Sequence, residues 1–265
     1  MLVAIQQDET AVTQYAYEFV RARMRRKPAC VLGLATGGTP LRLYQAMVEG
    51  HRRGELDFSL VHTFNLDEYI GLEANHPQSY HFFMKTHLFD QVNMQPAHVH
   101  FLSGLPDDIE THCAQYEQLI REVGGIDVQV LGIGRDGHIG FNEPTSSLCS
   151  RTRDKVLAPG TIKDNQRYFA HEEDVPRWAL TMGVGTILEA REILMLATGA
   201  AKAGAIAAMI EGPVTAMCTA SALQLHPRVT VVCDEGAASR LEQADYYRWI
   251  ARNEAGIHEA LRRKR

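Results

Sequence analysis

The chain has 265 residues, of which 45% are hydrophobic and 22% are charged, and its formal net charge at pH 7 is −5. This composition is ordinary for a globular domain and excludes the basic face that nucleic-acid binding requires. No apolar stretch reaches the roughly 18 residues of a membrane span, and the N-terminus lacks the basic and apolar run of a secretory signal.

The cysteines are scattered, without a C-x-x-C pair, at Cys30, Cys113, Cys149, Cys218 and Cys233. This spacing favours reduced thiols in a cytoplasmic protein over a zinc site or a disulfide framework. The only basic run, residues 262–265, is a C-terminal tail that we expect to be solvated. We therefore expect neither a nucleic-acid nor a membrane partner.

Hydrophobic periodicity predicts an alternation of helices and strands. In chain order we expect a helix over 8–26, a strand over 29–35, a helix over 40–53, a strand over 60–66, a helix over 78–89, a strand over 99–102, a helix over 107–122 and a strand over 126–134. Beyond an irregular, polar stretch over 145–180, we expect a strand over 191–197, a helix over 200–210, a strand over 228–234 and a helix over 237–263.

Alternating helices and nearly continuous apolar strands are typical of a mainly parallel sheet with helices on both faces. No repeat and no Gly-, Ser- or Pro-rich linker divides the chain. The sequence thus predicts one α/β domain over 1–265, Rossmann-like in layout. Because long polar segments of this kind often close over a site, we expect a lid within the irregular stretch over 145–180.

Ligands of open parallel sheets bind beyond the carboxyl ends of the strands, so the residues that directly follow each strand are the candidates for a binding site. After the strand over 29–35 come Thr36, Gly37, Gly38 and Thr39. Thr39 is a good N-cap and Pro40 suits the first helical position, so this turn is either a phosphate site at a helix N-terminus or a plain strand-to-helix connection. It lacks the lysine and the spacing of a Walker A loop.

Asp67 directly follows the strand over 60–66. A carboxylate at this position should project into the same crevice as the glycine turn, where partial burial would raise its pKa and make it a useful general base. The alternative is a purely structural role, in which Asp67 is the N-cap of the following turn.

The strand over 126–134 leads into a literal G-x-G-x-x-G at Gly132, Gly134 and Gly137. Dinucleotide binding needs a long helix and an unencumbered backbone after this motif, whereas Asp136 would repel a diphosphate and Pro144 would interrupt the helix. The motif therefore does not indicate a dinucleotide site.

His138 lies between Asp136 and Glu143 in this segment. Imidazole is the best acid-base group near neutral pH once a partner fixes one ring nitrogen, and two carboxylates within a tight turn could do so. A loop histidine held by local hydrogen bonds is the other interpretation.

Over nearly its whole length the sequence resembles the glucosamine-6-phosphate deaminase (glucosamine-6-phosphate isomerase) family. The resemblance runs from TGGTP through FNLDEYIGL, HPQSYHFFM and GIGRDGHIGFNEPTSSLCSRTR to MGVGTILEA and LQLHPRVTVVCDE. It implies the conversion of glucosamine 6-phosphate and water to fructose 6-phosphate and ammonia, without a metal or an organic cofactor.

The resemblance also implies roles for individual residues. His138 would open the pyranose ring, held and polarised by Asp136 and Glu143, and Asp67 would move the C2 proton to C1. Arg167 and Lys202 would bind the phosphate together with the glycine turn, although Arg177 lies near enough in the sequence to replace Arg167.

Some members of this family are hexamers activated by N-acetylglucosamine 6-phosphate at a subunit interface, so the resemblance suggests a homo-oligomer. Ser146, Arg153 and Lys155 match that effector site, but Val156 replaces a hydroxyl residue of the regulated enzymes. Gly140 departs from a more usual alanine, a change that we expect only to loosen the turn. The segment over 157–180 matches the lid of the family's active site, so the resemblance implies a lid there.

Three other functions deserve comparison with deamination. A deaminase of galactosamine 6-phosphate would use the same residues. A 6-phosphogluconolactonase-like hydrolase has no carbon acid to deprotonate and therefore no need for Asp67. A sugar-phosphate sensor would not need both Asp67 and His138, and both are present.

Overall fold

The computed structural model describes the backbone of residues 1–262 and the surroundings of side chains as far as residue 254. The rest of the predicted basic tail, residues 263–265, and the last residue of the helix predicted over 237–263 lie outside the described residues. Among the described helices, none is both long and apolar enough to cross a membrane.

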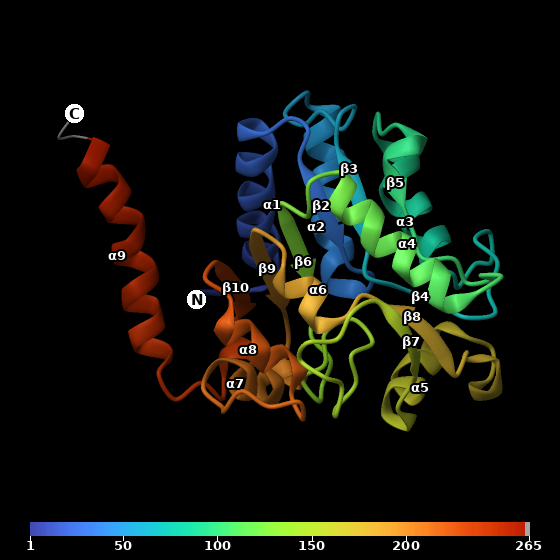
Figure 1. Cartoon of the computed structure of the whole chain (residues 1–265). Coiled ribbons are helices and arrows are strands. Elements are labelled where there is room, and N and C mark those ends of the chain that lie inside the picture. The colour runs from blue at the N-terminus through green and yellow to red at the C-terminus, as the bar shows by residue number, and fades with distance from the viewer. Residues whose placement is uncertain (263–265) are drawn as a thin grey trace.

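A seven-stranded sheet forms the centre of the molecule (Figure 1). Its strands are β1 (Leu2–Gln6), β2 (Val31–Leu34), β3 (His62–Asn65), β5 (Val99–His100), β6 (Val128–Leu131), β9 (Glu192–Ala197) and β10 (Val229–Asp234). The strand order is β1-β10-β9-β6-β2-β3-β5, and every neighbouring pair is parallel. The predicted single α/β domain with a mainly parallel sheet is confirmed; β1 was not predicted.

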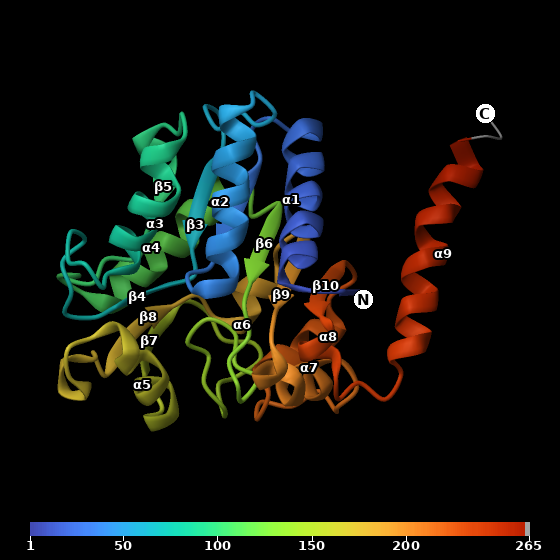
Figure 2. The same cartoon turned by 180° about the vertical axis from the view of Figure 1, so that it is seen from behind.

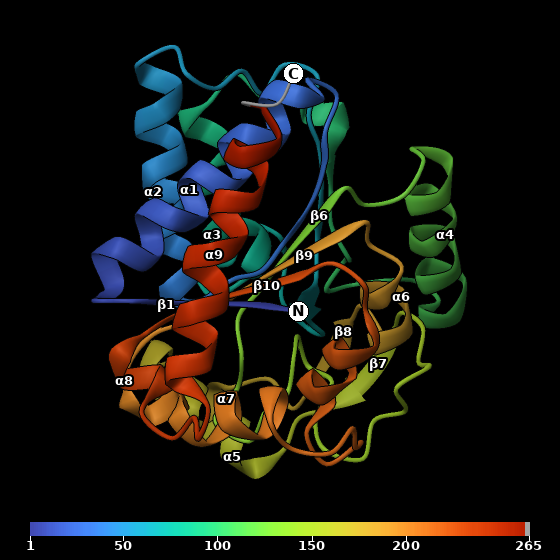
Figure 3. The same ribbon diagram turned by 90° about the vertical axis from the view of Figure 1, so that its left-hand side faces the viewer.

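Helices cover both faces of this sheet, as the view along its edge shows (Figure 3). One face packs against α1 (Glu9–Arg26), α2 (Gly38–Arg52) and α3 (Tyr80–His87). The other packs against α4 (Ile109–Glu122), α6 (Val184–Leu188), α7 (Ala203–Ile210) and α8 (Glu235–Ala238). The carboxylates of Asp8 and Asp108 accept hydrogen bonds from the first turns of α1 and α4, which sets where these two helices begin.

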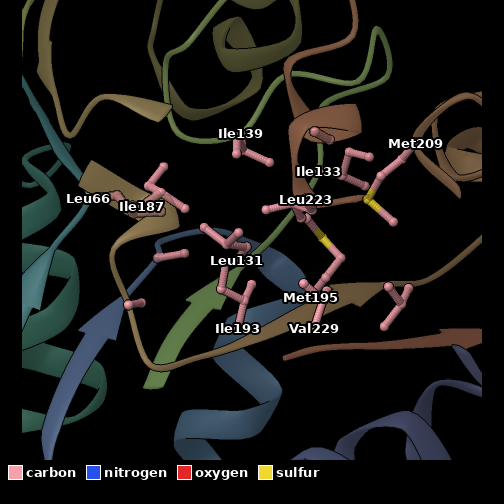
Figure 4. Close-up of a cluster of buried hydrophobic side chains, with 14 of the residues drawn as sticks. Leu66, Leu131, Ile133, Ile139, Ile187, Ile193, Met195, Met209, Leu223 and Val229 are labelled. Carbon is pink, nitrogen blue, oxygen red and sulfur yellow. The ribbon is translucent and has the colours of Figure 1, made fainter. Parts of the chain in front are cut away.

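Alternation along the strands divides the core into two apolar clusters. In β9, Leu194 and Leu196 face α1 and α2, whereas Ile193 and Met195 join the cluster on the opposite face. Figure 4 shows the second cluster, in which Leu131 of β6 lies with Ile193 and Met195. This two-sided burial explains why the strands are nearly continuous apolar runs.

The buried side of α1 contains Val12, Ala16, Val20 and Met24, which recur every four residues, together with Tyr17 and Phe19. This spacing places the apolar residues on one side of the helix, where they pack against the sheet.

The helix predicted over 237–263 is interrupted. α8 ends at Ala238 and α9 (Ala244–Arg262) begins six residues later, because Leu241 turns into the core and Glu211 accepts the backbone N–H groups of Glu242 and Gln243. From this break α9 runs alongside β1 and then projects away from the body of the molecule (Figures 1 and 2).

The predicted irregular stretch over 145–180 is the largest error of the sequence interpretation. It contains β7 (Arg153–Val156), helix α5 (Pro159–Asn165) and most of β8 (Trp178–Thr181). β8 pairs antiparallel with β7 and with β4 (Asp67–Tyr69), so these strands form a second, three-stranded sheet. Asp67 thus begins a strand of its own, opposite Thr181, and is not an N-cap.

Candidate active site

The strand order changes direction between β2 and β6, which are neighbours in the sheet but far apart in the chain. In open α/β sheets this switch point, at the carboxyl ends of the strands, is where ligands bind. A cavity of about 350 Å³ lies there. It is lined by residues from four strand ends and from the segment after β7, including Thr36, Gly37, Gly38, Thr39, Asp67, His138, Arg167 and Lys202.

The glycine turn reaches the cavity through a tighter geometry than predicted. Gly37 has a φ of 121°, which an L side chain rarely adopts, and this lets α2 begin at Gly38. Thr39 therefore lies in the first helical turn and is not the N-cap, and Pro40 is not at the first position. A Cβ atom added at Gly37 or Gly38 would meet nothing within 4 Å, so the backbone here faces open space.

This geometry suits an anion. The first N–H groups of α2 have no carbonyl partner inside the helix, and the helix dipole favours negative charge beside them. The hydroxyl oxygens of Thr39 and Thr198 lie 3.2 Å apart, which joins the glycine turn to the end of β9.

Two cations line the same cavity. The ammonium of Lys202 is partly buried and donates to the carbonyl of Ile133 at 2.6 Å, and its burial lowers the pKa of this lysine. Arg167 is exposed and stacks on the Tyr168 ring at 4.7 Å. Arg177, the alternative considered from the sequence, is not among the lining residues.

Asp67 lines the cavity although only 6% of its surface is exposed. Burial is the main cause that raises its pKa from 3.8 to about 8; the negative Glu68 adds to the effect, and His138 opposes it. A carboxyl group with a pKa near the working pH is well suited to take a proton from carbon and return it.

His138 stands over the backbone of Gly134, and a Cβ atom there would lie 2.4 Å from the ring. Its Nδ1 lies 2.7 Å from Asp136 Oδ1 and 3.3 Å from Glu143 Oε2. Since both carboxylates contact Nδ1, the other ring nitrogen, Nε2, is left for a ligand in the cavity. Gly134 of the G-x-G-x-x-G thus makes room for an imidazole, which gives this glycine a purpose without a dinucleotide.

The electrostatics of this trio favour an imidazolium. Burial lowers the pKa of His138, but the contacts with Asp136 and Glu143 outweigh it and raise that pKa to about 9. Burial also raises the pKa of Glu143, but the contact with His138 and hydrogen bonds from Thr161 and Ala158 together outweigh this, and the pKa falls below its usual value. The three side chains therefore form a charged network.

The same trio could also hold a cation, because Asp136, His138 and Glu143 can each offer one ligand atom within 4.8 Å of the others. Its donor set of two carboxylates and one imidazole fits a divalent metal. Occupancy by a metal would require Nδ1 of His138 to exchange its two carboxylate contacts for a metal bond, because both carboxylates contact that same nitrogen.

Glu143 also connects His138 to the segment predicted as a lid. Its Oε1 accepts the backbone N–H of Ala158 at 3.1 Å, at the point where that segment leaves β7. Further along, the Asn165 side chain donates to the Tyr69 hydroxyl at 2.8 Å. The segment over 157–180 is therefore tied at two places, to Glu143 and to Tyr69.

An aromatic wall was not identified from the sequence. Tyr69, Tyr80, Phe141 and Phe169 line the cavity, with ring centroids 4.9 to 6.0 Å apart in the closest pairs. Only Tyr80 of these rings lies in the helix predicted over 78–89, and the others come from β4, from the turn after β6 and from the segment after β7, so no local pattern joins the four.

The residues that match the effector site lie apart from the cavity lining. Ser146 is buried, while Arg153 and Lys155 are partly buried on β7. Arg153 donates to the Asn142 side chain at 3.0 Å, next to Glu143 in the chain. Among the residues that the structure describes, no hydrogen bond or ion pair joins these three side chains, and Val156 is 64% exposed.

Comparison with known proteins links this geometry to an activity. A family model described as glucosamine-6-phosphate isomerases/6-phosphogluconolactonase matches residues 6–232. A glucosamine-6-phosphate deaminase of Hahella chejuensis is 53% identical over 250 residues, which make up 94% of this chain and 95% of that protein.

Two solved structures extend the comparison. A monomeric glucosamine-6-phosphate deaminase superposes with a TM-score of 0.89 at 43% identity and covers 91% of this chain and 100% of its own. A 6-phosphogluconolactonase from Leishmania guyanensis superposes with a TM-score of 0.70 over 89% of this chain and 97% of its own, but at 21% identity it shares only the fold.

Proposed function

The chain belongs to the glucosamine-6-phosphate deaminase family and converts glucosamine 6-phosphate and water to fructose 6-phosphate and ammonia, and from this premise we propose how its residues divide the reaction. The observation that carries the proposal is that one cavity contains a buried carboxyl group, an oriented imidazole and an anion site. A volume of about 350 Å³ is within the range of sites for small ligands.

The phosphate of the substrate binds at the glycine turn. The free N–H groups at the start of α2, the hydroxyls of Thr36 and Thr39, and the cationic Lys202 and Arg167 surround this end of the cavity. Charge-assisted hydrogen bonds of this kind are among the strongest single contacts available to a protein. Anchoring at this end directs C1 and C2 of the sugar toward Asp67 and His138.

His138 opens the ring. As an imidazolium it gives the Nε2 proton to the ring oxygen and then takes up the proton of the C1 hydroxyl, so that the open-chain aldehyde forms and the imidazolium is restored. Asp136 and Glu143 keep the imidazole oriented and stabilise its positive charge through Nδ1.

Asp67 then performs the isomerisation. Its carboxylate takes the proton from C2 while the aldehyde oxygen takes a proton from the His138 imidazolium, which forms an enolamine, and Asp67 then returns its proton to C1. The imine that results at C2 adds water and releases ammonia, so that the carbonyl of fructose 6-phosphate is left at C2. A carboxylate base paired with an imidazole is a known combination for moving protons next to a carbonyl.

The segment over 157–180 acts as the lid. Six of its residues line the cavity, namely Thr161, Asp164, Asn165, Arg167, Tyr168 and Phe169. Because Arg167 belongs to both the lid and the phosphate site, phosphate binding favours closure, and closure excludes water from the proton transfer.

We propose the remaining properties on the resemblance alone. The enzyme works in the cytoplasm in the breakdown of amino sugars; it forms a homo-oligomer, with a hexamer as the expected size, and Ser146, Arg153 and Lys155 contribute to an effector site. The 43%-identical relative is described as monomeric. Light scattering distinguishes a monomer from an oligomer. A measured mass equal to that of one chain would mean that this protein is a monomer, like that relative.

The activity is tested by ammonia release from purified protein. Glucosamine 6-phosphate should be turned over in preference to its C4 epimer, galactosamine 6-phosphate, and 6-phosphogluconolactone should not be hydrolysed. Release from the epimer alone would assign the second deaminase activity. Adding N-acetylglucosamine 6-phosphate to the same assay tests for activation.

A further inference from the structure

A second buried carboxyl group lies next to Asp67, and the proposed mechanism does not use it. Glu68 is 2% exposed. Its Oε1 accepts the backbone N–H groups of Tyr69 at 2.8 Å and Tyr80 at 3.0 Å. Its Oε2 accepts the Ser79 hydroxyl at 2.7 Å and the backbone N–H of His81 at 3.0 Å.

These contacts require an ionised carboxylate. The three backbone N–H groups can only donate. The Ser79 oxygen already accepts the N–H groups of His81 and Phe82 as the cap of α3, so it gives its own proton to Glu68. Four donors therefore point at the two oxygens of Glu68. If the carboxyl group were protonated, its own O–H would face one of these donors, which would then have no acceptor.

Glu68 also connects two walls of the cavity. It belongs to β4, directly after Asp67, and its partners Ser79, Tyr80 and His81 form the start of α3. Gln78, Ser79 and Tyr80 line the cavity, as Asp67 does. A single buried side chain thus fixes the base relative to this rim.

The charge of Glu68 stands out because most other titratable groups around Asp67 are neutral. The titratable groups other than Glu68 are four tyrosines and one histidine. The tyrosines are Tyr44 on α2, Tyr69 on β4, Tyr80 on α3 and Tyr116 on α4, and the histidine is His138, in the turn after β6. Burial raises the pKa of each of these tyrosines, so they carry no charge near neutral pH. The fixed charges that face Asp67 are therefore Glu68, which is negative, and His138, which is positive.

We propose that Glu68 is a positioning residue for the deaminase reaction: its buried carboxylate clamps Asp67 to the rim at residues 78–80 and keeps a fixed negative charge beside the base. This inference rests on the proposed role of Asp67. The negative charge makes Asp67 a stronger base than burial alone would, because it disfavours a second negative charge nearby.

The pH profile of kcat/KM tests the charge. Activity requires ionised Asp67, so it rises with pH through the pKa of Asp67, and this rise forms the acid limb of the profile. Glu68→Gln removes the neighbouring charge and should move the acid limb to lower pH by about one unit. The variant should also lose kcat, because its base is weaker, while KM stays near the wild-type value.

Three variants separate charge from structure. Glu73→Gln, which removes an exposed carboxylate from the following loop, should leave the acid limb unchanged. Glu68→Asp keeps the charge, and Ser79→Ala keeps it while removing one donor. Both should keep the wild-type acid limb, although both lose activity through a loosened rim. Thermal unfolding followed by circular dichroism identifies the variants that fold.

The outcomes are distinct. A folded Glu68→Gln enzyme whose acid limb coincides with that of the wild type would overturn the proposal, as would an equal shift in Glu68→Asp. If Glu68→Gln does not fold, Glu68→Asp carries the test alone, and a shifted limb contradicts the assigned role. If Asp67→Asn still exchanges the C2 hydrogen of the substrate with solvent, the role of Asp67 itself fails, whatever Glu68 does.

Discussion

Replacing Glu143 with glutamine isolates one of the two charges that hold His138. The contacts of His138 with Asp136 and Glu143 raise its pKa from 6.5 to about 9, which corresponds to roughly 3 kcal/mol at 1.36 kcal/mol per pKa unit. The two carboxylates lie at similar distances from Nδ1, 2.7 and 3.3 Å, so the loss of one should remove about half of this, or roughly 1.5 kcal/mol.

The effect must depend on pH in one direction. A histidine whose pKa is raised by folding stabilises the protein fully below its unfolded pKa of 6.5, and this stabilisation is lost as the pH rises through about 9. Glu143→Gln should therefore destabilise the protein more at pH 6 than at pH 10. The loss of other Glu143 contacts is the same at both pH values and cancels in the comparison.

Urea unfolding at these two pH values measures the difference, and NMR titration of the His138 ring measures the pKa directly. In Glu143→Gln the ring should titrate about one unit lower than in the wild type. Glu172→Gln, at an exposed site on the lid, makes the same charge change and should show no pH-dependent loss. Equal destabilisation of Glu143→Gln at both pH values, or an unshifted His138, would refute the charged network.

Three further changes test other parts of the site. Lys202→Ala should raise KM roughly thirtyfold, since a charge-assisted contact contributes about 2 kcal/mol, while Lys163→Ala on the exposed side of the lid should not; an unchanged KM in the first variant removes Lys202 from the phosphate site. Asn165→Ala removes the 2.8 Å bond to Tyr69 and should raise KM about fivefold and make residues 157–180 more sensitive to protease, whereas unaltered proteolysis would mean that this bond does not hold the lid. Extensive treatment with a chelator should leave ammonia release unchanged, because the His138 imidazolium already occupies the position between Asp136 and Glu143; activity that is lost and then restored by a divalent metal would instead make the trio a metal site.

The sequence was sufficient for the parts of the fold that depend on local periodicity. The seven-stranded sheet needs long apolar runs, and all of its strands except β1 were predicted close to their observed bounds. The same reasoning brought Asp67, His138 and the glycine turn to one edge of the sheet, because parallel strands that share an orientation place their carboxyl ends together.

The remaining features depend on pairings that local patterns do not contain. β4 and β8 are short and join residues more than 100 positions apart, such as Asp67 and Thr181. The Asn165–Tyr69 bond spans 96 positions. Glu68 shows most clearly what the sequence does not reveal. Two adjacent acidic residues such as Asp67 and Glu68 usually lie on the surface, and Glu68 is buried only because the fold places the start of α3 around it.

Hydrogen exchange at C2 of the substrate tests the central claim most directly. The wild-type enzyme, incubated with glucosamine 6-phosphate in deuterated water, should exchange or transfer the C2 hydrogen during turnover. Asp67→Asn should still bind the sugar phosphate, because its anion site is intact, but should show no exchange above the uncatalysed rate. Exchange at a rate near that of the wild type would mean that another group is the base.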